Sequence, residues 1–80
     1  MQKYSLFIKK IAKLYLASLP MKERNRIMDK IVLLSSGVWD LCDIKKMKSS
    51  DPNLFRLRVG KYRVIYEKHD DVFRILIISI

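Results

Sequence analysis

The sequence predicts an α+β domain in which an N-terminal helical hairpin packs on a mainly antiparallel sheet of three to four strands. In the first half of the chain, apolar residues recur with the period of an amphipathic helix. In the second half they alternate with polar residues, as in a half-buried strand. The chain has 80 residues, half of them hydrophobic, which suits one small core. We therefore expect residues 1–80 to form a single domain.

The first helix is predicted to begin near Ile8, after a short segment at residues 3–7 that is compatible with an edge strand. Its apolar stripe consists of Ile8, Ile11, Ala12, Tyr15 and Leu19. This helix ends at Leu19, because a residue that precedes proline avoids the helical conformation. The second helix is expected to begin at Pro20 and to end at Gly37. Its apolar stripe consists of Ile27, Met28, Ile31 and Leu34.

The strongest strand signal lies on either side of Gly60-Lys61. Residues 54–59 and 62–67 alternate between apolar and polar side chains, and glycine at the first central position suits a two-residue type II′ turn. This turn fixes the register, which places Val59 opposite Tyr62, Arg58 opposite Arg63, Leu57 opposite Val64 and Arg56 opposite Ile65. Residues 68–71 are expected to form a second, polar turn that exposes His69, and residues 72–80 to form the last strand.

The alternation sorts the side chains of this hairpin onto two faces. The face expected to carry the helices comprises Phe55, Leu57, Val59, Tyr62, Val64 and Tyr66. The opposite face carries Arg56, Arg58 and Arg63. Like charges directly opposite each other destabilise a sheet, and only Glu67 offers an acidic side chain at these positions. A cluster that opposes folding favours an anionic ligand over an ordinary solvated surface.

The composition points to a polyanionic partner. Seventeen Lys and Arg face eight Asp and Glu, which gives a net charge of +9 and attracts nucleic acid, an anionic membrane surface or an acidic protein. Cys42 and His69 are the only cysteine and histidine, so we expect no disulfide within the chain, no metal and no cofactor. Ile75–Ile78 is as long as any apolar run in the sequence and is far too short for a membrane span, and no signal peptide is evident. We therefore expect a cytoplasmic protein.

Residues 38–52 are predicted to be mostly connecting chain. They hold the basic cluster Lys45, Lys46 and Lys48, and a turn signal at Asp51-Pro52-Asn53. Trp39, beside the end of the second helix, is expected to cap the core rather than to stack on a base.

Three segments together resemble the RelE/ParE toxin superfamily. Residues 54–67, LFRLRVGKYRVIYE, resemble the central hairpin of that family, whose members carry strings such as YRLRVGDYRVIYE. Residues 43–48, DIKKMK, resemble its DVKKLKG segment, and Ser18-Leu19-Pro20 before a basic helix resembles its K-L-P break between two helices. The resemblance implies a RelE-like fold, in which the helical hairpin lies on a curved sheet.

The resemblance also implies a function. The RelE branch of the superfamily cleaves mRNA on the ribosome, the ParE branch inhibits DNA gyrase, and each toxin is held inactive by an antitoxin encoded beside it. Resemblance to the RelE branch implies that this chain is the toxin of a type II toxin–antitoxin system. Such a toxin is a ribosome-dependent mRNA endoribonuclease that inhibits translation. Its implied partners are the cognate antitoxin, the ribosome and mRNA. A ParE-like gyrase inhibitor is the alternative, because the hairpin string does not separate the two branches.

Metal-independent cleavage by these toxins uses the ribose 2′-OH as the nucleophile on the adjacent phosphate. Arg56, Arg58 and Arg63 match the family's basic positions and are predicted as the catalytic residues, since arginine binds phosphate through two hydrogen bonds and stays charged. The predicted RNA contacts are Lys45, Lys46, Lys48 and Lys61. Arginine is a poor general base, so the sequence leaves the general acid and base unassigned.

The C-terminus departs from the family pattern. In the family the last strand runs into a Gly-x-Arg motif, often followed by a tyrosine, whereas this chain ends at Ile80, where that motif is due to begin. The resemblance therefore implies a domain cut short after its last strand, and we expect it to be a weak or inactive nuclease. A catalytically inactive short form that still binds the antitoxin is a further alternative.

Overall fold

The computed structural model describes residues 3–80 as five strands and three helical segments. They are β1 (Ser5–Ile8), α1 (Lys10–Ser18), α2 (Met21–Ser35), the 3₁₀ turn η1 (Trp39–Leu41), β2 (Asp43–Lys46), β3 (Leu54–Val59), β4 (Tyr62–His69) and β5 (Arg74–Ser79). The strands form one sheet in the order β1-β5-β4-β3-β2, in which β1 runs parallel to β5 and the other pairs are antiparallel. The predicted α+β fold is confirmed, with five strands rather than three to four.

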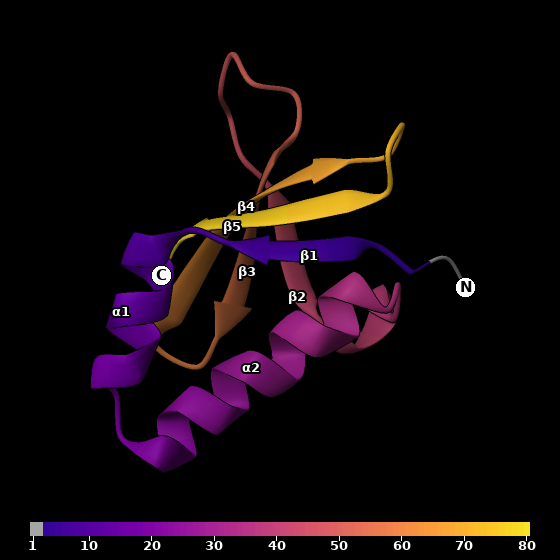
Figure 1. The fold of residues 1–80 in the computed structure, drawn as a ribbon. Helices are drawn as coiled ribbons and strands as arrows, with labels where there is room; N and C mark the ends of the chain where they lie inside the picture. Colours follow the sequence, from indigo (N-terminus) through magenta and orange to yellow (C-terminus); the bar gives the residue numbers. More distant parts are fainter. Residues whose placement is uncertain (1–2) are drawn as a thin grey trace.

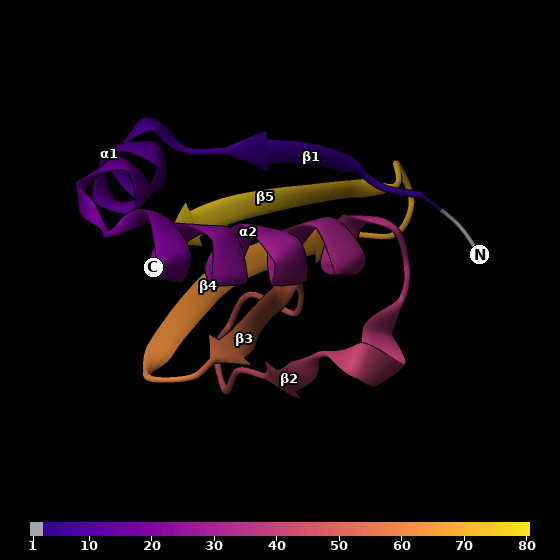
Figure 2. The ribbon, with the colours of Figure 1, turned by 90° about the horizontal axis from the view of Figure 1, so that it is seen from below.

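Both helices cover the same side of the sheet (Figure 1). In Figure 2, α2 lies along the sheet, and α1 is seen nearly end-on beside it, so the two helices of the hairpin cross at an angle. The core fills the space between these layers. The helices supply Ala12, Leu16, Ile27, Ile31 and Leu34, and the sheet supplies Leu57, Val59, Val64, Tyr66, Ile75 and Ile77. We call the other side of the sheet, which neither helix covers, the open face.

The stripe predicted for the second helix is confirmed by the buried residues of α2, but the one predicted for the first helix is partly wrong. Ile11 is 70% exposed and Tyr15 is 40% exposed, whereas Ala12 and Leu16 are buried. Periodicity failed here because α1 has only nine residues and also carries Leu14, so that apolar side chains surround most of the helix. Neither helix in the described part of the chain is long and apolar enough to span a membrane.

The β3–β4 hairpin has the predicted register. Val59 pairs with Tyr62, Arg58 with Arg63, Leu57 with Val64 and Arg56 with Ile65. Gly60 has a φ of 59°, and the next residue keeps a negative φ, which is the pattern of a type II′ turn. The three hairpin arginines therefore lie on the open face, as the sequence predicts.

Residues 38–52 are not mostly connecting chain, because they contain η1 and the edge strand β2. β2 pairs with β3 so that Asp43 lies opposite Arg58 and Lys45 lies opposite Arg56. The strand has four residues and only one of them, Ile44, is apolar, which leaves no alternation to recognise. Trp39 in η1 packs against the core as predicted, and its Nε1 donates a hydrogen bond of 2.9 Å to a carbonyl of α2.

The second turn lies at residues 70–73 rather than 68–71, because β4 continues to His69. Lys68 takes a strand position on the helix side, where its Nζ lies 4.2 Å from the ring centroid of Trp39 and 5.0 Å from that of Phe55. A long amphipathic side chain can cover apolar surface in this way. His69 is consequently not exposed in a turn, and its side chain is only 32% exposed.

Candidate nucleic-acid interface

Two arginines and two lysines meet on the open face. Arg56 on β3 and Arg63 on β4 point to this side because the buried neighbours Leu57 and Val64 point to the helices. Register then brings Lys45 of β2 opposite Arg56, and the loop after β2 adds Lys48. The sheet thus gathers cations from segments that are separate in the sequence.

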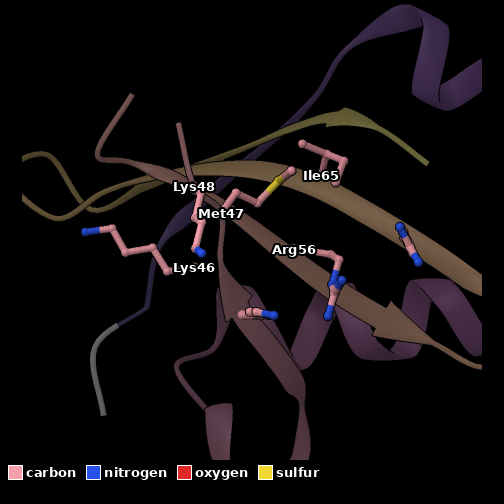
Figure 3. A pocket seen from close by; sticks show the side chains of 7 residues that line it. Lys46, Met47, Lys48, Arg56 and Ile65 are labelled. Atoms are coloured by element: carbon pink, nitrogen blue, oxygen red, sulfur yellow. The ribbon is translucent and has the colours of Figure 1, made fainter. Parts of the chain in front are cut away.

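These residues surround a hollow of about 330 Å³, which we call the basic pocket. Its lining consists of Lys45, Lys46, Met47, Lys48, Arg56, Arg63 and Ile65. Five of these seven side chains are cationic and none is acidic. Figure 3 shows Met47 extending in the direction of Ile65, which together give the pocket an apolar part beside its charges.

Arg56 stands out among the lining residues because one of its nitrogen atoms lacks a hydrogen-bond partner. Its Nε is buried and has no hydrogen-bond partner. Among residues 3–80, ion pairs involve Lys61, Lys68 and His69, and none involves an arginine. A buried donor without a partner is costly, and an anion in the pocket removes that cost.

Arg58 is separated from the basic pocket. It is exposed at the end of β3, and its Nε donates a hydrogen bond of 3.3 Å to the carbonyl oxygen of Gly60. It lines a second hollow together with Asp43, which lies opposite it on β2. The expectation that only Glu67 could offset the arginines is therefore wrong, because β2 brings a second carboxylate to the open face.

The other two predicted RNA contacts, Lys46 and Lys61, do not point into the basic pocket. Lys46 borders the basic pocket, but its side chain points away from the other labelled side chains (Figure 3). Lys61 lies in the β3–β4 turn, where its Nζ is 3.8 Å from Oε1 of Glu23 on α2. Tyr62 also donates a hydrogen bond to Glu23, which holds the hairpin turn against the helix. The hydrogen bond to this carboxylate raises the pKa of Tyr62 to about 12.

The open face also carries a group of polar side chains that the sequence did not single out. Glu67 and His69 follow Ile65 at alternate positions of β4, and Asn53 precedes β3. Nε2 of His69 lies 3.2 Å from Oε1 of Glu67, and Nδ1 lies 3.4 Å from Nδ2 of Asn53. The alternation along β4 predicts that Glu67 lies on this face. Nothing in the sequence indicates that Asn53 belongs to the same group.

The chemistry of the basic pocket is that of an anion site. Guanidinium and ammonium groups bind phosphate oxygens through charge-assisted hydrogen bonds and stabilise negative charge that develops on phosphorus ligands. Arginine stays protonated, so Arg56 and Arg63 can hold a phosphate but are poor proton acceptors. The pocket is therefore suited to binding a phosphate group and to stabilising negative charge on it.

No family model matches the chain, and no curated protein matches its sequence. Among solved structures, the chain is similar to the archaeal RelE–RelB complex from Pyrococcus horikoshii OT3, at 30% identity and a TM-score of 0.79 over 98% of this chain and 92% of that one. The toxin–antitoxin complex RelBE2 from Mycobacterium tuberculosis is similar at 20% identity and a TM-score of 0.79, over 99% and 90% of the two chains. A mutant of the E. coli toxin RelE in the free state is similar at 20% identity and a TM-score of 0.71, over 98% and 81%.

Proposed function

Since this chain belongs to the RelE family of toxins, we propose that it is the toxin of a toxin–antitoxin system and that it cleaves mRNA on the ribosome. Cleavage of translated mRNA inhibits protein synthesis, and the protein acts in the cytoplasm, where translation takes place. The observation that supports this proposal best is the basic pocket, whose lining holds five cations, among them Arg56 with its unpartnered Nε.

In this proposal, Arg56 and Arg63 hold the scissile phosphate, and Lys45 and Lys48 hold the RNA backbone beside it. All four line the same hollow, and none of them forms an ion pair within residues 3–80. Their charges stabilise the additional negative charge that forms when the 2′-OH attacks phosphorus. Arg58, which lies opposite Arg63 but outside the pocket, binds a flanking phosphate.

We also propose that an antitoxin binds this chain, as RelB does in the similar archaeal complex. The apolar side chains that α1 leaves in solvent support such a partner. Ile11, Leu14 and Tyr15 are 70%, 62% and 40% exposed, and Ile11 and Tyr15 line a hollow of about 230 Å³ between α1 and the end of β5. Apolar surface of this kind favours a protein partner over RNA.

The test is to map the 5′ ends of a translated mRNA by primer extension after adding the protein to a reconstituted translation reaction. The proposal predicts new ends within codons that depend on translation, and loss of these ends when Arg56 and Arg63 are both replaced by Gln. A form extended by a Gly-x-Arg segment after Ile80 is assayed in parallel, because the pocket offers no evident proton acceptor. Inhibition of gyrase supercoiling with no RNA ends from either form contradicts the proposal.

A further inference from the structure

The group formed by Asn53, Glu67 and His69 lies next to the basic pocket but is not part of it. Asp51 holds the group in place from the loop before β3, since its Oδ1 accepts a hydrogen bond of 2.9 Å from the backbone N–H of Asn53. This hydrogen bond lowers the pKa of the Asp51 carboxyl. The loop and the end of β4 thus present an amide, an imidazole and a carboxylate side by side.

The position of this group follows from the geometry of β4. Ile65 lines the basic pocket, and Glu67 and His69 share its face of the strand. At about 3.3 Å per residue, Glu67 lies roughly 7 Å and His69 roughly 13 Å along the strand from Ile65. These side chains are therefore too far along the face to serve the phosphate held by Arg56, but they are within reach of a nucleotide that flanks it.

We propose that Asn53, Glu67 and His69 form a nucleobase subsite, which accepts adenine, cytosine or guanine and disfavours uracil. The inference rests on the proposed function, because that function places RNA in the basic pocket. Bases of single-stranded RNA are recognised by hydrogen bonds to their edges and by stacking on planar side chains such as histidine. A carboxylate only accepts hydrogen bonds, so Glu67 pairs with a base that carries an exocyclic amine. Uracil instead presents carbonyl oxygens on both sides of its single edge N–H.

The group remains accessible to such a ligand. The Glu67 side chain is 26% exposed and that of His69 is 32% exposed. The contacts of His69, at 3.2 and 3.4 Å, are long for hydrogen bonds and can be exchanged for contacts to a base. A carboxylate beside five cations also weakens the attraction for any RNA phosphate. A hydrogen bond from the exocyclic amine of a base to Glu67 offsets this loss of attraction. Glu67 therefore suits selection among bases better than it suits binding of RNA in general.

The test uses a translated mRNA library randomised around the cleaved codon, in which the bases flanking each cut are read by sequencing. The wild-type protein is expected to disfavour uracil at one flanking position by between about fivefold and a hundredfold. Glu67→Gln removes the charge and adds a donor, so we expect this preference to disappear while the melting temperature stays unchanged. Asp71→Asn carries the same change in charge in an exposed turn and should keep the wild-type preference. An unchanged preference in Glu67→Gln, or no preference in the wild type, overturns the inference.

A second measurement separates the inference from the proposed function. Side-chain NMR signals of Asn53 and His69 are followed while short oligoadenylate or oligouridylate is added to the free protein. The inference predicts larger shifts with oligoadenylate, and a loss of the difference in Glu67→Gln. Such shifts in a protein that cleaves no mRNA, either as residues 1–80 or when extended by a Gly-x-Arg segment, contradict the proposed function and leave the subsite standing. Equal shifts with both oligonucleotides contradict the subsite even if cleavage is observed.

Discussion

Arg56 is the side chain on which the proposed RNA site depends most. It lies on the open face by strand register, it lines the basic pocket, and its buried Nε has no partner. These three observations favour contact with an anion. The sequence predicted this residue and Arg63 because the register of a two-residue hairpin is set by nearby residues alone. Asp43 and Asn53 reach the open face through contacts with strands elsewhere in the chain, and their roles could not be read from local pattern.

Replacement of Arg56 by Gln is expected to separate function from stability. Loss of one group that stabilises the developing charge typically reduces the rate of cleavage by about a hundredfold to a thousandfold. The melting temperature should stay the same or rise, because the change removes a buried donor that has no partner. Lys22→Gln, an exposed change of the same charge on α2, is the matched control and should cleave at the wild-type rate. A large fall in melting temperature for the Arg56 variant would instead indicate a structural role.

Tyr62 gives the fold a dependence on alkaline pH. Its pKa is raised from 10.0 to about 12, chiefly by the hydrogen bond that its hydroxyl donates to Glu23. Because the folded protein holds this proton more tightly than the unfolded chain does, the stabilisation is complete below about pH 10 and is lost as the pH rises towards 12. In urea titrations, the difference in free energy of unfolding between the wild type and Tyr62→Phe should shrink over that range. A difference that stays constant from neutral pH to about 12 would show that the hydrogen bond is not the cause.

The strands and helices were predictable to different degrees. The β3–β4 hairpin and α2 have strong local signals, which are a glycine turn with strict alternation and a stripe of four apolar residues. The edge strand β2 has a single apolar residue and owes its conformation to pairing with β3. The sequence predicts that the strand ends before Lys68, although β4 continues to His69, and the reason is related. Lys68 is typical of a turn, but in the strand its side chain is stabilised by the rings of Trp39 and Phe55.

Two substitutions in α1 test which of its sides is buried. Leu16 is 5% exposed and packs in the core, so Leu16→Ala should lower the free energy of unfolding by about 2–5 kcal/mol. Ile11 is 70% exposed, and Ile11→Ala should change it by less than about 0.5 kcal/mol. The measurement is chemical denaturation of both variants beside the wild type. Equal losses for the two variants would mean that α1 is turned differently on the sheet.

Over the molecule as a whole, the two faces of the sheet differ in composition. Among residues 3–80, the helix side buries eleven hydrophobic residues and makes the core, whereas the open face carries the basic pocket, Arg58 and the polar group around His69. The net charge of +9 was evident from composition, and the fold concentrates part of it on one side. Composition alone could not show this, because it does not say which cations lie together.

Binding of single-stranded RNA should therefore depend steeply on salt. If four or five phosphates are neutralised, the logarithm of the association constant should fall with the logarithm of the salt concentration with a slope of about −3. Replacing Arg56 and Arg63 together by Gln should make the slope less negative by about 1.4, because two phosphate contacts are lost. Fluorescence anisotropy of a labelled oligoribonucleotide at several salt concentrations measures both values. A slope near zero would show that phosphate contacts do not carry the binding.

Photo-crosslinking on the ribosome tests most directly whether the basic pocket is the surface that contacts mRNA. The protein is added to ribosomes that hold an mRNA with photoreactive nucleotides in the codon open to the toxin, and the cross-linked peptides are identified by mass spectrometry. The proposed site predicts adducts on residues 45–48, 56 and 63, and their loss in the Arg56→Gln, Arg63→Gln variant. Adducts confined to α1 and α2, with none on the open face, would contradict it.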